Sequence, residues 1–309
     1  MKLKASFTAP ILAIVIFTLL YASRFIDVSK MGTGSVLFLS IIAIQLVVLM
    51  FPGAFYCRLK DSTYTNRLNL KLFSPGYFGY IVFTALALIA GVAIFRCVQV
   101  YVFNINDASF IPYFTGLSYG IDTSGVTYSI ITFAVIPAIS EEFIFRSVLF
   151  RDYQDEGASD VATILVTSLL FAMLNFSIAQ FPVYFLAGVT FAFVTYVTGS
   201  SIAAMITHFI FGLYTLFLDK YIVNVISKPD NIVFFLFVLV ILFLIFAIFS
   251  FSEAERISRR NSLSGIDTPF HIKKRTVNQK WYISARNVLT SPTFLACVGL
   301  FVIFSVFSA

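Results

Sequence analysis

The chain has 309 residues, of which 59% are hydrophobic and only 12% are charged. A soluble domain carries about 25% charged residues, and a particle of this size cannot hide so much apolar surface from water. The composition therefore excludes a soluble globular protein and a disordered chain. The net charge of +6 is typical of membrane proteins with basic cytoplasmic loops, so no nucleic-acid partner is expected.

In chain order, runs of about 20 mostly apolar residues predict membrane-spanning helices. Nine candidates occur, at residues 6–23, 34–55, 77–101, 126–150, 161–178, 181–198, 201–219, 231–251 and 291–308. The predicted fold class is an all-α polytopic membrane protein, a helical bundle of about nine transmembrane helices.

The basic residues of the connecting segments predict the orientation of the bundle. With the N-terminus in the cytoplasm, most of the 21 Lys and Arg residues fall in inner segments. The longest inner segment, 253–290, is basic, and its composition predicts contact with anionic lipid headgroups. The outer segments hold Arg24, Lys30, Lys220 and Lys228.

The chain is predicted to have three parts. Residues 1–125 form the first three spanning helices and an outer loop, 104–125. Residues 126–220 form a core that carries the polar groups described below. Residues 221–309 form the last two helices and the basic cytoplasmic loop 253–290.

The clearest chemical signal is a pair of adjacent acids, Glu141 and Glu142, in an apolar span. Glu142 and Arg146 are four residues apart, which predicts an ion pair on one helix face and leaves Glu141 about 100° away around the helix. A carboxylate in that setting can act as a general base toward water. Pro137 predicts a kink that opens room beside the acids. The alternative is that both acids are merely solvated at the lipid interface.

Two further polar residues, Asn175 and His208, fall in later spans. Counting from the predicted turns near Gly157 and Gly199 places both at depths similar to that of Glu141, so the groups are predicted to share one cavity. Taken singly, Asn175 is typical of a helix–helix hydrogen bond, and His208 fits packing as well as it fits function.

No cofactor is expected. Zinc takes about three good ligands, and Glu141, Glu142 and His208 supply them only if Glu142 gives up its arginine. The HExxH signature is absent from the sequence. These points disfavour a metal site, but three potential ligands are present, so a divalent metal stays an open alternative.

These residues resemble the motifs of the CPBP (Abi) family, which includes the type II CAAX prenyl endopeptidases and lysostaphin-resistance-protein-A-like proteins. Glu141-Glu142-x-x-x-Arg146 matches the E-E-x-x-x-R motif. Phe171-x-x-x-Asn175 matches F-x-x-x-H with Asn in place of His. His208-x-x-x-Gly212 matches the last motif, H-x-x-x-N or D, with Gly in place of Asn. The resemblance covers about residues 126–220.

The resemblance implies that Glu141 activates water, that His208 stabilises the oxyanion, and that Glu142 and Arg146 support them. Asn175 cannot relay a proton as His does, and Gly212 offers no side chain. Loss of one oxyanion donor typically costs about 10²–10³ in rate. The resemblance also implies a membrane protein or peptide as substrate and, together with the absence of a targeting signal, a bacterial plasma membrane.

Three functions compete. The first is an intramembrane endopeptidase of the CPBP type with an atypical site. The second is a catalytically degenerate relative that acts as a membrane binding, scaffold or immunity protein, which the changes at Asn175 and Gly212 favour. The third is a transporter. It is disfavoured because transporters carry broken helices at corresponding positions of two repeated halves, and this sequence has no counterpart to the break expected at Pro137. The sequence does not indicate an oligomeric state.

Overall fold

The computed structural model describes residues 5–26, 30, 35–60, 68–102, 123–226, 232–263 and 281–308, and within these ranges all regular structure is helical. The predicted all-α fold is confirmed. The α-helices are α1 (Ala5–Ser23), α2 (Ser35–Gln45), α3 (Phe51–Lys60), α4 (Phe78–Tyr101), α5 (Thr123–Ile130), α6 (Ile136–Glu142), α7 (Phe150–Asp155), α8 (Asp160–Met173), α9 (Phe181–Thr198), α10 (Ser201–Phe217), α11 (Asp219–Ile226), α12 (Ile232–Leu263), α13 (Trp281–Leu289) and α14 (Pro292–Ser308).

Three π-helical stretches and one 3-10 turn join these helices. The π-helical stretches are η2 (Leu46–Met50), η5 (Ile131–Val135) and η6 (Phe143–Leu149), and the 3-10 turn is η4 (Pro75–Tyr77). A proline closely follows two of the π-helical stretches, Pro52 after η2 and Pro137 after η5. Proline lacks an N–H and clashes with the carbonyl four residues earlier, and a wider helical turn accommodates both effects. Pro137 therefore lies within one long apolar helix, Gly125–Asp155.

Among the described residues, six helices are long and apolar enough to span a membrane, and eight spans result if each of two bent pairs counts as one. The bent pairs are α10 with α11, at 55°, and α13 with α14, at 64°. The candidate at 161–178 forms α8, whose 14 residues fall short of the roughly 20 that a span needs. The structure thus supports an integral membrane protein, while the count of nine spans is not confirmed.

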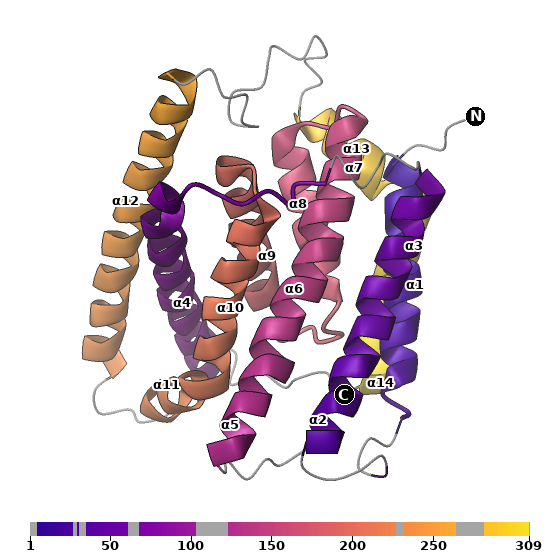
Figure 1. The fold of residues 1–309 in the computed structure, drawn as a ribbon. Coiled ribbons are helices and arrows are strands. Elements are labelled where there is room, and N and C mark those ends of the chain that lie inside the picture. Colours follow the sequence, from indigo (N-terminus) through magenta and orange to yellow (C-terminus); the bar gives the residue numbers. More distant parts are fainter. Residues whose placement is uncertain are drawn as a thin grey trace.

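The helices stand side by side, with α4 and α12 at one edge and α1, α2, α3 and α14 at the other (Figure 1). Between these edges lie α6, α8, α9 and α10; α10 packs against both α6 and α9, and α9 packs against α8. The part predicted to carry the polar groups therefore forms the centre of the bundle.

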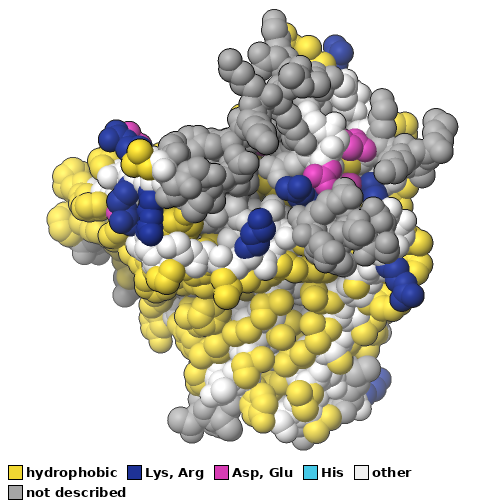
Figure 2. All heavy atoms as spheres, turned by 45° about the horizontal axis from the view of Figure 1, so that its top comes forward, with side chains coloured by type: hydrophobic (Ala, Val, Ile, Leu, Met, Phe, Trp, Pro, Cys, Tyr) yellow, Lys and Arg dark blue, Asp and Glu magenta, His cyan; other side chains and the backbone are white. Residues whose placement is uncertain are grey.

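The outside of the bundle is apolar below a rim where Lys and Arg side chains gather (Figure 2). Much of α12 is uncovered, with side chains such as Val233, Phe234 and Ile248 more than 60% exposed. This pattern is what a lipid-facing surface requires. Residues 104–122 of the predicted outer loop 104–125, residues 264–280 of the predicted basic loop, Lys2 and Lys4 lie outside the described residues.

Candidate functional site

The centre of the site is the Glu142 carboxylate at the end of α6. Its Oε1 accepts a hydrogen bond from Arg146 Nη1 at 3.0 Å and lies 2.9 Å from His208 Nδ1 on α10. The Glu142 and Arg146 side chains are fully buried. The structure contains the ion pair that the four-residue spacing predicts, and it adds His208 to the same carboxylate oxygen.

Two phenylalanines cover the charged groups. The Arg146 guanidinium lies 4.5 Å from the Phe171 ring centroid on α8 and 5.4 Å from that of Phe191 on α9. The His208 ring stacks on Phe191 at 4.6 Å and meets the edge of Phe171 at 5.9 Å. These contacts stabilise a cation and an imidazole away from bulk water. Phe171 begins the second motif, whereas no sequence signal pointed to Phe191.

A backbone carbonyl of a glycine also accepts a hydrogen bond from Arg146. Arg146 Nη2 donates to the backbone oxygen of Gly188 on α9 at 2.8 Å. A Cβ at Gly188 would lie 3.1 Å from the Cα and Cβ of Ser168. The missing side chain therefore lets α8 and α9 approach closely enough to present this carbonyl. In the sequence, Gly188 is marked only by being a glycine within an apolar span, a residue type that allows close helix packing.

Glu141 is 4% exposed and lies on α6 beside Glu142. It interacts electrostatically with Arg146 and with Tyr184 of α9. One carboxylate of the acidic pair thus anchors the arginine and the histidine. The Glu141 carboxylate lies near the Arg146 guanidinium as well, while Glu142 keeps its ion pair with that arginine.

Asn175 lies just after α8, four residues beyond Phe171. Its Nδ2 is buried without a hydrogen-bond partner, and the next residue, Phe176, has a left-handed φ of 48°. Asn175 is outside the hydrogen-bonded group of Glu142, Arg146 and His208. The side chain at the second-motif position therefore supplies neither a charge nor a proton relay to that group.

Gly212, at the last motif position, packs closely against the π-helical stretch η5. A Cβ built on Gly212 would lie 3.1 Å from both the Cα and the Cβ of Ala134 in η5. An asparagine cannot occupy this place without moving a helix. The amide donor of the last motif is missing, and the close contact with Ala134 disfavours a side chain in its place.

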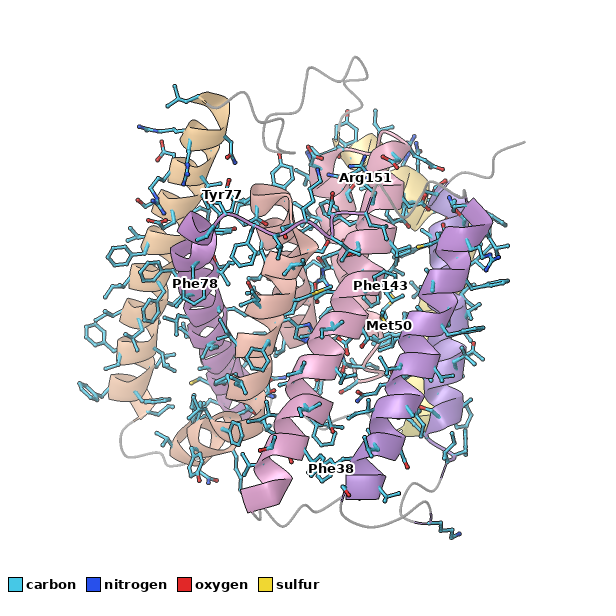
Figure 3. The ribbon with its side chains drawn as sticks, in the orientation of Figure 1. Phe38, Met50, Tyr77, Phe78, Phe143 and Arg151 are labelled. Carbon is cyan, nitrogen blue, oxygen red and sulfur yellow. The ribbon has the colours of Figure 1, made fainter. Side chains whose placement is uncertain are left out.

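The site lies at mid-height in the bundle. Phe143, the residue after Glu142, lies between Phe38 near one end and Arg151 near the other, and it faces Met50 of η2 (Figure 3). Charged groups at this depth are costly unless paired, which explains the ion pair. Glu142 Oε2 and Arg146 Nε are buried without partners. The 12% exposed His208 side chain gives the group an accessible edge.

Within the described ranges, no three His, Cys, Asp or Glu side chains are grouped as a metal site requires. Glu142 keeps its arginine, so the three-ligand set of Glu141, Glu142 and His208 is not assembled.

A second buried polar cluster lies at the N-terminal end of α9. Arg96 of α4 donates to Gln99 and Gln180 at 3.0 Å and lies 3.5 Å from Asp219. Tyr214 of α10 also donates to Asp219, at 3.1 Å. This cluster joins α4 to the start of α9 and to the bend between α10 and α11.

One comparison with known proteins finds a family. Residues 123–214 match the family model described as "Rce1-like: Type II CAAX prenyl endopeptidase Rce1-like". The match contains all three motif segments, from Glu141 to Gly212, and confirms the resemblance that these motifs indicated. No curated protein and no solved structure matches the chain.

Proposed function

We propose that this chain is an intramembrane endopeptidase with an atypical site, and the match of residues 123–214 to the Rce1-like model of type II CAAX prenyl endopeptidases supports this function. The observation that carries the proposal is the Glu142–Arg146–His208 group buried at mid-height in an apolar bundle. Buried ion pairs in membranes are expensive, so an ion pair that also orients a histidine points to chemistry.

Glu141 is the proposed group that binds and polarises a water molecule. The water attacks the carbonyl carbon of a peptide bond in a membrane protein or peptide. Glu142 and Arg146 hold His208 beside this water. The described residues show no donor at Gly212 for the oxyanion, so turnover is expected to be slower than with a complete set by about 10²–10³-fold.

The second candidate is a catalytically degenerate relative that binds or scaffolds a membrane partner. The contact between Gly212 and Ala134 favours it, because the last motif position is filled by packing. Asn175 favours it too, since this residue cannot relay a proton. On this alternative the ion pair only maintains the fold.

Turnover decides between the two candidates. We would incubate the protein in nanodiscs with membrane peptides, with and without a prenylated cysteine, and detect products by mass spectrometry. The peptidase predicts cleavage that Glu141→Gln abolishes and that Glu255→Gln, at an exposed acid on α12, leaves unchanged. Absence of cleavage by the wild-type protein supports the scaffold. A bacterial plasma membrane is our proposed location, on the family resemblance.

A further inference from the structure

The hydrogen bond between His208 and Glu142 determines which ring nitrogen carries a proton. Glu142 Oε1 already accepts from the Arg146 guanidinium, so it carries no hydrogen of its own. The 2.9 Å contact with His208 Nδ1 therefore requires Nδ1–H to donate. In a neutral ring the lone pair is then on Nε2.

This tautomer conflicts with the oxyanion role that the resemblance implies for His208. An oxyanion needs an N–H donor, and Nε2 donates only if the ring gains a second proton. Arg146 already balances the charge of Glu142, and Phe171 and Phe191 cover the ring with apolar surface. Glu141, also near Arg146, is the further charged group on the same helix.

We propose that His208 Nε2 is the proton acceptor of the reaction and takes over the task that Asn175 cannot perform. This inference rests on the proposed endopeptidase function. While Glu141 holds the water, one water proton moves to Nε2 as the oxygen bonds to the peptide carbonyl carbon. The imidazolium, held by Glu142, then gives that proton to the amide nitrogen as the C–N bond breaks. The products are a carboxylic acid and an amine.

The geometry around the ring suits this role. Phe191 stacks on the imidazole and Phe171 meets it at 84°, so the ring is held in one orientation. Nδ1 points at Glu142, which turns Nε2 to the opposite side of the ring. The side chain keeps 12% of its surface exposed although its carboxylate partner is fully buried. The histidine is therefore the accessible member of this pair, while Glu142 is enclosed.

The tautomer can be measured without turnover. The chain has two histidines, so His271→Gln leaves His208 as the only one. In this variant, labelled with ¹⁵N-histidine, NMR at neutral pH is expected to show a protonated Nδ1 and an unprotonated Nε2. A ring with the proton on Nε2, or with both nitrogens protonated, would overturn the inference. Glu142→Gln, whose amide can donate a hydrogen bond as well as accept one, is the variant expected to change this pattern.

Activity measurements on variants of His208 provide a second test of the inference. Gln at position 208 can donate a hydrogen bond but cannot take a proton. His208→Gln and His208→Ala are therefore both expected to lower kcat/KM about 10²–10⁴-fold, and added imidazole is expected to restore part of the activity of His208→Ala. If Gln keeps most of the activity while Ala loses it, His208 is an oxyanion donor and the inference fails alone. If the wild-type protein shows no cleavage that depends on Glu141, both the proposed endopeptidase function and the role of His208 as proton acceptor are wrong.

Discussion

Gly212 of α10 packs directly against Ala134 of η5, with no room for a side chain between the two helices. An added Cβ would lie 3.1 Å from two atoms of Ala134, one of them the backbone Cα, which cannot rotate away. The absence of the last-motif side chain is therefore part of the packing of the bundle, because this contact joins the helix of His208 to the helix of the two acids.

Gly212→Ala is expected to destabilise the protein by about 1–3 kcal/mol, because overpacking forces a helix to shift. Thermal unfolding in detergent micelles measures the effect. The matched control is Gly299→Ala in α14, where an added Cβ meets nothing within 4 Å. Equal melting temperatures for the two variants would contradict the close contact. For the same reason, Asn175→His with Gly212→Asn is expected to unfold the site rather than restore a complete one.

The ion pair of Glu142 and Arg146 is expected to contribute strongly to stability in its present form. Arg146→Gln leaves a buried carboxylate without its cation, at a cost of about 3–5 kcal/mol. Glu255 and Arg259 on α12 have the same four-residue spacing, but their side chains are 63% and 76% exposed. Arg259→Gln is therefore expected to cost only about 0–1 kcal/mol. Denaturant unfolding of both variants compares the pairs, and similar losses would argue against burial of the first pair.

The buried cluster around Arg96 yields a prediction about charge. Arg96→Met leaves Asp219 buried without its guanidinium and is expected to lower the melting temperature markedly. Arg96→Met combined with Asp219→Asn removes both charges, so the double variant is expected to recover part of the loss. A double-mutant cycle in micelles measures this coupling. Strictly additive losses would show that the two charges do not interact.

The orientation of the bundle can be tested with single cysteines. Cys57, Cys97 and Cys297 are all buried, so they give little background with a maleimide that cannot cross membranes. Tyr221 is 69% exposed on α11, and Glu255 is 63% exposed on α12. With a cytoplasmic N-terminus, intact cells are expected to label Tyr221→Cys and to leave Glu255→Cys unlabelled until they are lysed. The reverse pattern would invert the predicted topology.

The composition and the apolar runs were sufficient to predict a helical membrane protein, because about 20 apolar residues in succession have no other stable place. All nine predicted segments contain a helix. Their division into spans was less predictable, since the length of an apolar run does not reveal a bend such as the 55° between α10 and α11. Similarly, the i, i+4 spacing predicted the Glu142–Arg146 pair because that contact is local to one helix.

The contacts between helices were beyond the reach of the sequence. Periodicity says which residues share a helix face, but not which residue of another helix meets that face. His208 is 66 positions from Glu142, and only the packing of α10 against α6 joins them. Phe191 and Gly188 enter the site in the same way, through the approach of α9 to α8. Local spacing thus determined which charges lie side by side on one helix, while tertiary packing brought His208 to Glu142 and set Gly212 against Ala134.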